Sequence, residues 1–146
     1  MLLADFKLKD YQLPSGYLIP PVPGRLDYLL HIQDFLMEKF NCRIDDRLNG
    51  LDIGSGANGI YCILGVQHFN WKMVGSETDL KAVEIANVNL ELTKELCDNI
   101  EIRHQENKSF LFKNTIQAKE KFDFVVCNPP FHGSKEDAIK GSLKKL

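Results

Sequence analysis

The sequence predicts an α/β fold with a mostly parallel sheet that stops after its fourth strand. Short apolar segments of strand length alternate with longer segments in which apolar residues recur at helical spacing. A glycine-rich turn follows the first apolar segment, and an Asn-Pro-Pro-aromatic motif follows the last. The chain has 146 residues, which is enough for one domain with a modest core.

The expected elements follow one another along the chain. Residues 11–24 are rich in proline and aromatic side chains, so we expect an extended N-terminal segment over 1–24 rather than a helix. Helices are expected over 25–40, from 58 and over 80–95, and strands over 48–53, 71–77, 100–103 and 122–127. A flexible basic tail is expected over 132–146. In the helix over 80–95, the residues expected to face inward are Ala82, Val83, Ile85, Ala86, Val88 and Leu92.

Composition describes an ordinary globular protein. Hydrophobic residues make up 44% of the chain and charged residues 26%, and the net charge is −2. This charge argues against a generally cationic nucleic-acid binder, but it does not exclude a local basic groove. No apolar run approaches the ~20 residues of a membrane span, and the first residues do not resemble a signal peptide. We therefore expect a cytoplasmic protein without membrane contact.

Cysteine spacing gives no sign of a metal site. Cys42, Cys62, Cys97 and Cys127 are far apart and form no Cys-x-x-Cys motif. We expect all of them to be reduced and most to be buried, with no bound metal. The sequence does not indicate the oligomeric state.

A glycine-rich motif occupies the predicted turn after the first strand. Gly54, Gly56 and Gly59 have the G-x-G-x-x-G spacing, which lets the backbone approach a ligand closely. Asp52 precedes them, and capping of the turn and contact with a ligand are both open roles for its carboxylate. Glu77 ends the next predicted strand about 20 residues later, where an acid can bind ribose hydroxyls. A dinucleotide interpretation would favour NAD, whereas the Asp-Ile-Gly-Ser-Gly form favours S-adenosylmethionine.

The motif Asn128-Pro129-Pro130-Phe131 follows the last predicted strand. The Asn128 side-chain oxygen can accept a hydrogen bond from an amine, and the Pro129 carbonyl can accept a second one. The Phe131 ring offers a face on which a planar group can stack. This set suits a flat acceptor with an exocyclic amine, such as adenine. The alternative is a rigid turn without function.

Taken together, these motifs resemble the class I, Rossmann-like, S-adenosylmethionine-dependent amino-methyltransferases. The stretch from Gly16 to Tyr28, the segment from Asn58 to Tyr61, and the Asn-Pro-Pro-Phe-His sequence from Asn128 are more specific. They resemble the RlmF family of bacterial 23S ribosomal RNA adenine-N6 methyltransferases and its relative, methyltransferase-like protein 16. The resemblance runs from about Tyr11 to the end and implies a partial methyltransferase domain over 1–146.

The resemblance also implies residue roles. Arg25 would bind the methionine carboxylate of S-adenosylmethionine, while Asp52, Gly54, Ser55 and Gly56 would line the cofactor. Glu77 would hold the ribose hydroxyls, and Ser109 lies near a further cofactor-contacting position of the family. The catalytic set would be Asn128, Pro129, Pro130 and Phe131.

The implied reaction transfers a methyl group to N6 of an adenine in 23S ribosomal RNA. Hydrogen bonds to the amine and correct positioning can carry this reaction without a strong general base. Two alternatives stay open. One is methylation of a protein glutamine amide, although Phe131 stands where such enzymes usually carry Tyr. The other is a fragment that binds cofactor or RNA without turnover.

Overall fold

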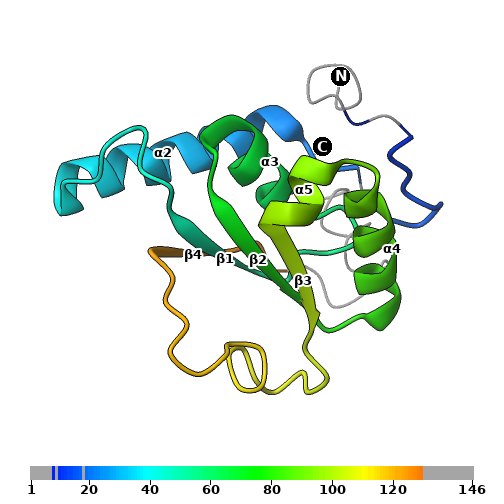
Figure 1. Ribbon diagram of the computed structural model, residues 1–146. Coiled ribbons are helices and arrows are strands. Elements are labelled where there is room, and N and C mark those ends of the chain that lie inside the picture. The colour runs from blue at the N-terminus through cyan, green and yellow to red at the C-terminus, as the bar shows by residue number, and fades with distance from the viewer. Residues whose placement is uncertain (1–7, 9, 18, 130–146) are drawn as a thin grey trace, which may run out of the picture.

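Within the described residues, a four-stranded parallel sheet forms the centre of the protein (Figure 1). A computed structural model describes Leu8, residues 10–17 and residues 19–129. The strand order is β3-β2-β1-β4, so β1 lies between β2 and β4 and pairs with both in parallel. The expected parallel α/β fold is therefore confirmed. The strands span Asn49–Ile53 (β1), Lys72–Glu77 (β2), Ile100–His104 (β3) and Phe124–Cys127 (β4).

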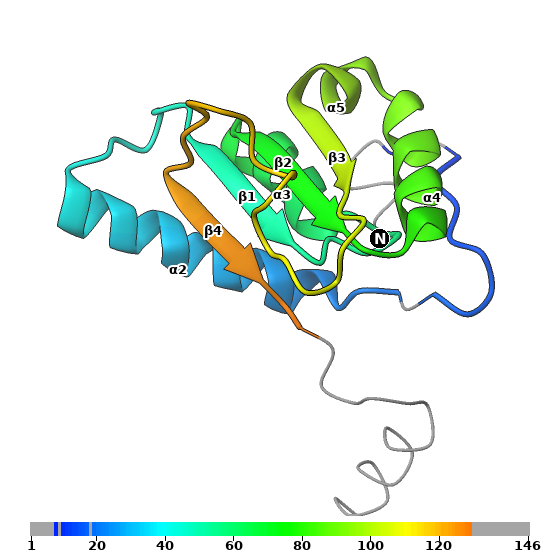
Figure 2. The same ribbon diagram turned by 90° about the horizontal axis from the view of Figure 1, so that it is seen from below.

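Helices pack against one face of the sheet. The helix α3 contacts β1 and β2, α2 packs on α3, and α4 contacts β3. Figures 1 and 2 show α2 and α3 on one side of the strands, while the yellow segment between β3 and β4 crosses the other side. The helices span Val22–Phe40 (α2), Ile60–Phe69 (α3), Leu80–Glu91 (α4) and Lys94–Asn99 (α5). No helix in this described part is both long and apolar enough to cross a membrane.

The segment between β3 and β4 is fixed to the sheet by Arg103. The Arg103 guanidinium donates two hydrogen bonds to the Glu120 carboxylate, at 2.7 and 2.9 Å, and a third to the Thr115 carbonyl. It also pairs with Glu101 at 2.7 Å. Because a guanidinium and a carboxylate match in a two-point contact, this pair fixes the direction in which the chain returns to β4.

Aromatic packing fills the core beside the sheet. Trp71, which precedes β2, is fully buried. Its ring stacks on Phe69 with centroids 4.2 Å apart and contacts Phe124 of β4 at 4.7 Å. The end of α3 and the two strands therefore share one apolar cluster.

The start of α2 differs from the sequence-based expectation. The helix begins at Val22, whereas we expected extended chain up to Gly24. Pro23 explains the difference, since proline is well tolerated in the first turn, where its missing N–H has no helical partner. The end agrees with expectation, because Asn41 caps the helix with a left-handed φ of 59°.

The single helix expected over 80–95 is two helices. The helix α4 ends at Glu91, and Thr93 caps the start of α5. Val88 and Leu92 are 63% and 43% exposed, so the prediction that they face inward was wrong. Asn89 is buried instead, because its side-chain amide exchanges two hydrogen bonds with the backbone of Gln12.

The other expected elements are present with shifted ends. Two of the cysteines, Cys97 and Cys127, are exposed, so the prediction that most are buried was wrong, although all four are free thiols. Cys127 is exposed because residues of β4 alternate between the helix-covered face and the opposite face. The tail expected over 132–146 lies outside the described residues.

Close packing around Gly50 predicts a strong effect of one methyl group. A Cβ at Gly50 would lie 2.3 Å from Phe124 Cζ and 2.7 Å from Met73 Sδ. We expect Gly50→Ala to lower the free energy of unfolding by about 1–3 kcal/mol, as overpacking does. Gly24→Ala is the matched control, since a Cβ there meets nothing within 4 Å and alanine favours a helix. Chemical denaturation of both variants measures the difference, and equal stabilities would contradict the packing argument.

Candidate active site

Most of the sequence motifs meet in one pocket at the carboxyl ends of β1 and β4. Its volume is about 360 Å³, within the range of small-ligand sites. In a parallel α/β sheet this edge is where ligands bind. The pocket is lined by Ile19, Pro20, Pro21, Arg25, Asp52, Gly54, Ser55, Gly56, Asn58, Ile60, Tyr61 and Asn128.

The glycine turn forms the floor of this pocket. Gly54 and Gly56 have φ values of 76° and 64°, in the left-handed region that side chains with a Cβ rarely adopt. The backbone N–H groups of Gly54 and Ser55 both donate to the Ser76 carbonyl, at 2.8 and 3.0 Å. These two bonds attach the glycine turn to the end of β2 and so fix its position beside the pocket.

Glu77 braces the same turn. Its Oε2 accepts a hydrogen bond of 2.9 Å from the Gly56 N–H. Its Oε1 accepts bonds of 2.7 and 2.9 Å from the N–H groups of Thr78 and Asp79. Three backbone donors therefore hold the carboxylate beside the glycine turn, although Glu77 is not among the lining residues of the pocket.

The N-terminal segment closes the pocket from another side. The Tyr11 hydroxyl donates a 2.7 Å hydrogen bond to the Asn58 carbonyl, and burial raises the pKa of Tyr11. The Asn58 side chain in turn accepts from the Ile60 N–H at the start of α3. The segment is thus attached to the loop that leads from the glycine turn into α3.

Arg25 connects both motifs. Its Nη1 donates to the Asn128 side-chain oxygen at 3.2 Å and to the Tyr61 hydroxyl at 3.0 Å. The guanidinium carbon lies 5.4 Å from the centre of the Tyr61 ring, a cation–π distance. The first turn of α2 therefore supplies a positive charge between the glycine turn and the end of β4.

Asp52 is a buried carboxylate beside that charge. Burial and, to a smaller extent, the negative charge of Glu77 raise the pKa of Asp52 to about 7, although Arg25 acts in the opposite direction. Asp52 Oδ2 lies 3.9 Å from Cys62 Sγ. Within the described residues, neither Asp52 Oδ1 nor the buried Ser55 Oγ has a hydrogen-bond partner. Buried polar atoms are almost always paired, so two unpaired ones beside a pocket indicate a site for a polar ligand.

The remaining predicted site residues are placed less centrally. Pro129 is exposed directly after Asn128, whereas Pro130 and Phe131 lie outside the described residues. Ser109 is exposed in the segment after β3, where its N–H donates to the Asn107 side chain. Ser109 is not among the residues that line the pocket.

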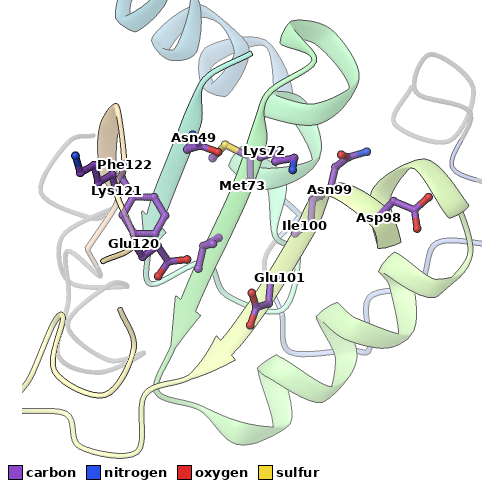
Figure 3. A pocket seen from close by; sticks show the side chains of 11 residues that line it. Asn49, Lys72, Met73, Asp98, Asn99, Ile100, Glu101, Glu120, Lys121 and Phe122 are labelled. Carbon is purple, nitrogen blue, oxygen red and sulfur yellow. The ribbon is translucent and has the colours of Figure 1, made fainter. Parts of the chain in front are cut away.

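A second hollow lies at the opposite edge of the sheet. It has a volume of about 240 Å³ and is lined by the first residues of the strands, including Asn49, Lys72 and Ile100 (Figure 3). Glu101 and Glu120 also face it, together with lysines. None of the predicted site residues lines this hollow. Among the described residues, no three His, Cys, Asp or Glu side chains gather closely enough to hold a metal.

Comparison with known proteins agrees with this geometry. The sequence profile of a family described as RNA methyltransferase matches residues 1–146. The chain belongs to this family. The resemblance seen in the sequence motifs is thereby confirmed. The ribosomal RNA large subunit methyltransferase F of Christiangramia forsetii is 41% identical over 146 residues, which are 100% of the chain and 50% of the relative.

Solved structures of human METTL16 domains share the fold of this chain. The N-terminal domain of human METTL16 in complex with SAH has a TM-score of 0.76 and 29% identity over 99% of this chain and 57% of that chain. The hMettl16 catalytic domain in complex with the MAT2A 3'UTR hairpin 1 has a TM-score of 0.76 and 32% identity over 95% of this chain and 44% of that chain. The Rossmann-like methyltransferase fold is therefore shown. The chain spans about half the length of the curated relatives it matches.

The motifs alone missed several contacts that shape the site. Tyr61 follows the glycine turn in an apolar stretch and therefore resembles a core residue, and it is indeed buried. Its hydroxyl nevertheless contacts Arg25, which lies 36 positions away in the sequence. Tyr11 and Asn58 were likewise not predicted to meet. The only indication in the sequence that Tyr11 packs against the glycine-turn region was the aromatic character of residues 11–24.

The raised pKa of Asp52 predicts how stability depends on pH. Its ordinary value is 3.8, so between pH 4 and about 7 the folded state holds a proton that the unfolded state releases. The contribution of Asp52 to stability is therefore fully present at low pH and is lost as the pH rises, by about 1.4 kcal/mol per pH unit. We expect the stability of Asp52→Asn relative to wild type to rise with pH between about 4 and 7 and to level off above pH 7.

Chemical denaturation at several pH values tests this expectation. Asp34→Asn is the control, because Asp34 is exposed on α2 and reports the loss of a surface carboxylate. A constant stability difference between Asp52→Asn and wild type over this pH range would show that Asp52 does not titrate in it.

Proposed function

We propose that this chain carries the cofactor and acceptor site of a methyltransferase that modifies N6 of an adenine in 23S ribosomal RNA. The observation that carries the proposal is the convergence of Arg25, Asp52 and Asn128 on one pocket. The name of the relative from Christiangramia forsetii, a large-subunit ribosomal RNA methyltransferase, supports the substrate class. A cytoplasmic location follows from such a substrate.

The residues of the pocket fit S-adenosylmethionine. Arg25 would hold the methionine carboxylate, because a guanidinium binds a carboxylate through two parallel hydrogen bonds. The unpaired Asp52 Oδ1 would compensate the positive charge of the amino acid part, and Ser55 Oγ would gain a partner. Glu77 would hold the ribose hydroxyls, and Ser109 is assigned to the cofactor as well. The human relative solved with SAH supports this choice of ligand.

Asn128 and Pro129 would hold the acceptor. The Asn128 oxygen and the Pro129 carbonyl accept hydrogen bonds from an amine, which orients its lone pair away from both oxygens. S-adenosylmethionine supplies the electrophilic methyl group when bound. Phe131 and Pro130 complete the motif, and stacking on Phe131 would hold a base that has left a paired strand.

Cofactor binding can be measured on the chain itself. We expect S-adenosylhomocysteine to bind and Glu77→Ala to weaken binding by about 1.5–3 kcal/mol, the range for hydrogen bonds to a charged group. Glu77→Gln keeps the shape of the side chain and should lose less. Glu84→Ala, an exposed acid on α4, is the control. Calorimetry compares the variants, and an unchanged affinity in Glu77→Ala would remove Glu77 from the site.

The reaction is tested in cells that lack the gene. Complementation with the intact gene should restore one N6-methyladenosine in large-subunit ribosomal RNA, measured by nucleoside mass spectrometry. Asn128→Ala should abolish this product but keep cofactor affinity within a few-fold. Phe131→Ala should weaken use of RNA by about 1–3 kcal/mol, as one lost base stack does. Full restoration by Asn128→Ala would refute the assignment, and methylated glutamine in place of adenine would favour the protein-directed alternative.

A further inference from the structure

The contact between Arg25 and Asn128 joins the two halves of the proposed site. Arg25 Nη1 is within hydrogen-bond distance of two oxygens, the Asn128 Oδ1 at 3.2 Å and the Tyr61 hydroxyl at 3.0 Å. Nη1 carries two hydrogens, so it can serve both oxygens at once. A guanidinium has five N–H donors in a fixed plane. The other three donors, on Nε and Nη2, are not used by these two contacts, so one side chain could hold the cofactor carboxylate and Asn128 together.

Tyr61 fixes the orientation of this guanidinium. Its ring is buried and lies 5.4 Å from the guanidinium carbon, so Arg25 is held by a ring face as well as by a hydroxyl. Burial raises the pKa of Tyr61, while the hydrogen bond from Arg25 acts in the opposite direction. Tyr28, one turn after Arg25 on α2, packs against the Tyr61 ring with centroids 5.8 Å apart. The plane of the guanidinium is therefore set by the protein before a ligand arrives.

A fixed Arg25 decides which end of the Asn128 amide is presented. The oxygen and nitrogen of an amide have nearly the same shape, but one accepts and the other donates. Arginine only donates, so it pairs with the oxygen and excludes the flipped amide. The oxygen has a second lone pair, which can accept an amine hydrogen. A flipped amide would present its NH₂ group instead, which suits a carbonyl oxygen rather than an amine.

We infer that Arg25 is a positioning and specificity-determining residue for the acceptor: by fixing Asn128 Oδ1 it makes the site accept an exocyclic amine and refuse a carbonyl at the same ring position. The inference rests on the proposed function and extends it, because one side chain serves both ligands. Adenine and hypoxanthine differ in that exocyclic group. The inference therefore assigns the preference for adenine over hypoxanthine to Arg25, in the first turn of α2.

The first experiment reads the contact without any ligand. In the ¹⁵N-labelled chain, nuclear relaxation of the Asn128 side-chain NH₂ group should report a rigid amide. Arg25→Lys keeps the charge but loses the planar fork, and Tyr61→Phe removes one acceptor of Nη1, so both should make the amide mobile. Tyr28→Phe loses a hydroxyl from a neighbouring ring and should leave the amide rigid. Equal amide order in wild type and Arg25→Lys would overturn the inference.

The second experiment measures selectivity with S-adenosylhomocysteine present at saturation. Wild type should bind adenosine monophosphate more tightly than inosine monophosphate by roughly tenfold, about the effect of one well-placed hydrogen bond. Arg25→Lys should reduce this ratio toward one. In an Asn128→Asp background both oxygens accept, so no amide needs orienting and Arg25→Lys should change the ratio little. A ratio unaffected by Arg25→Lys, or lowered equally in both backgrounds, would contradict the inference.

The two experiments separate the inference from the proposed function. If wild type does not bind S-adenosylhomocysteine, the proposed function fails, while the ligand-free relaxation data still decide whether Arg25 orders Asn128. If wild type binds it and the amide stays rigid in Arg25→Lys, the proposed function stands and the positioning role is wrong. Circular dichroism of each variant confirms that the fold is kept.

Discussion

Because β1 pairs in parallel with β2 on one side and β4 on the other, three distant parts of the chain must end at the same edge of the sheet. The register pairs Ile53 with both Ser76 and Cys127. Gly54 and Asn128, which follow β1 and β4, and Glu77, which ends β2, therefore lie at the same edge although they span 54 to 128 in the sequence. The site depends on this pairing more than on any single contact, since a slip of one residue would turn every side chain to the other face.

The charges of the site explain why a buried carboxylate is retained. Burying Asp52 is unfavourable for its ionised form, and Glu77 adds to the cost. Arg25 offsets part of it but is itself directed at Asn128 and Tyr61 rather than at Asp52. A ligand with a positively charged group would compensate the remaining negative charge of Asp52 and Glu77. The same balance gives the site its polarity, with the cation on α2 and the acids on the strands.

The sequence predicted the residues whose place follows from strand ends. Asp52, the glycines, Glu77 and Asn128 each border an apolar strand, so their meeting point follows from parallel pairing alone. It could not predict contacts made across the packing of helices, such as Arg25 with Tyr61, because periodicity marks Tyr61 only as buried. Val88 was misjudged for a related reason: helical spacing indicates a face, but only the packed N-terminal segment determines that Asn89 is buried there.

The attached N-terminal segment helps to fix the position of Arg25. Tyr11 is hydrogen-bonded to the loop at Asn58, and Pro20 and Pro21 line the pocket before α2 delivers Arg25. Proline restricts the backbone of this stretch, so little conformational freedom is lost when it closes over the glycine turn. Arg25 is therefore placed by a stiff connection on one side and by Tyr61 on the other. A side chain fixed from both directions can set the orientation of Asn128, whereas a freely moving arginine on a surface loop could supply only charge.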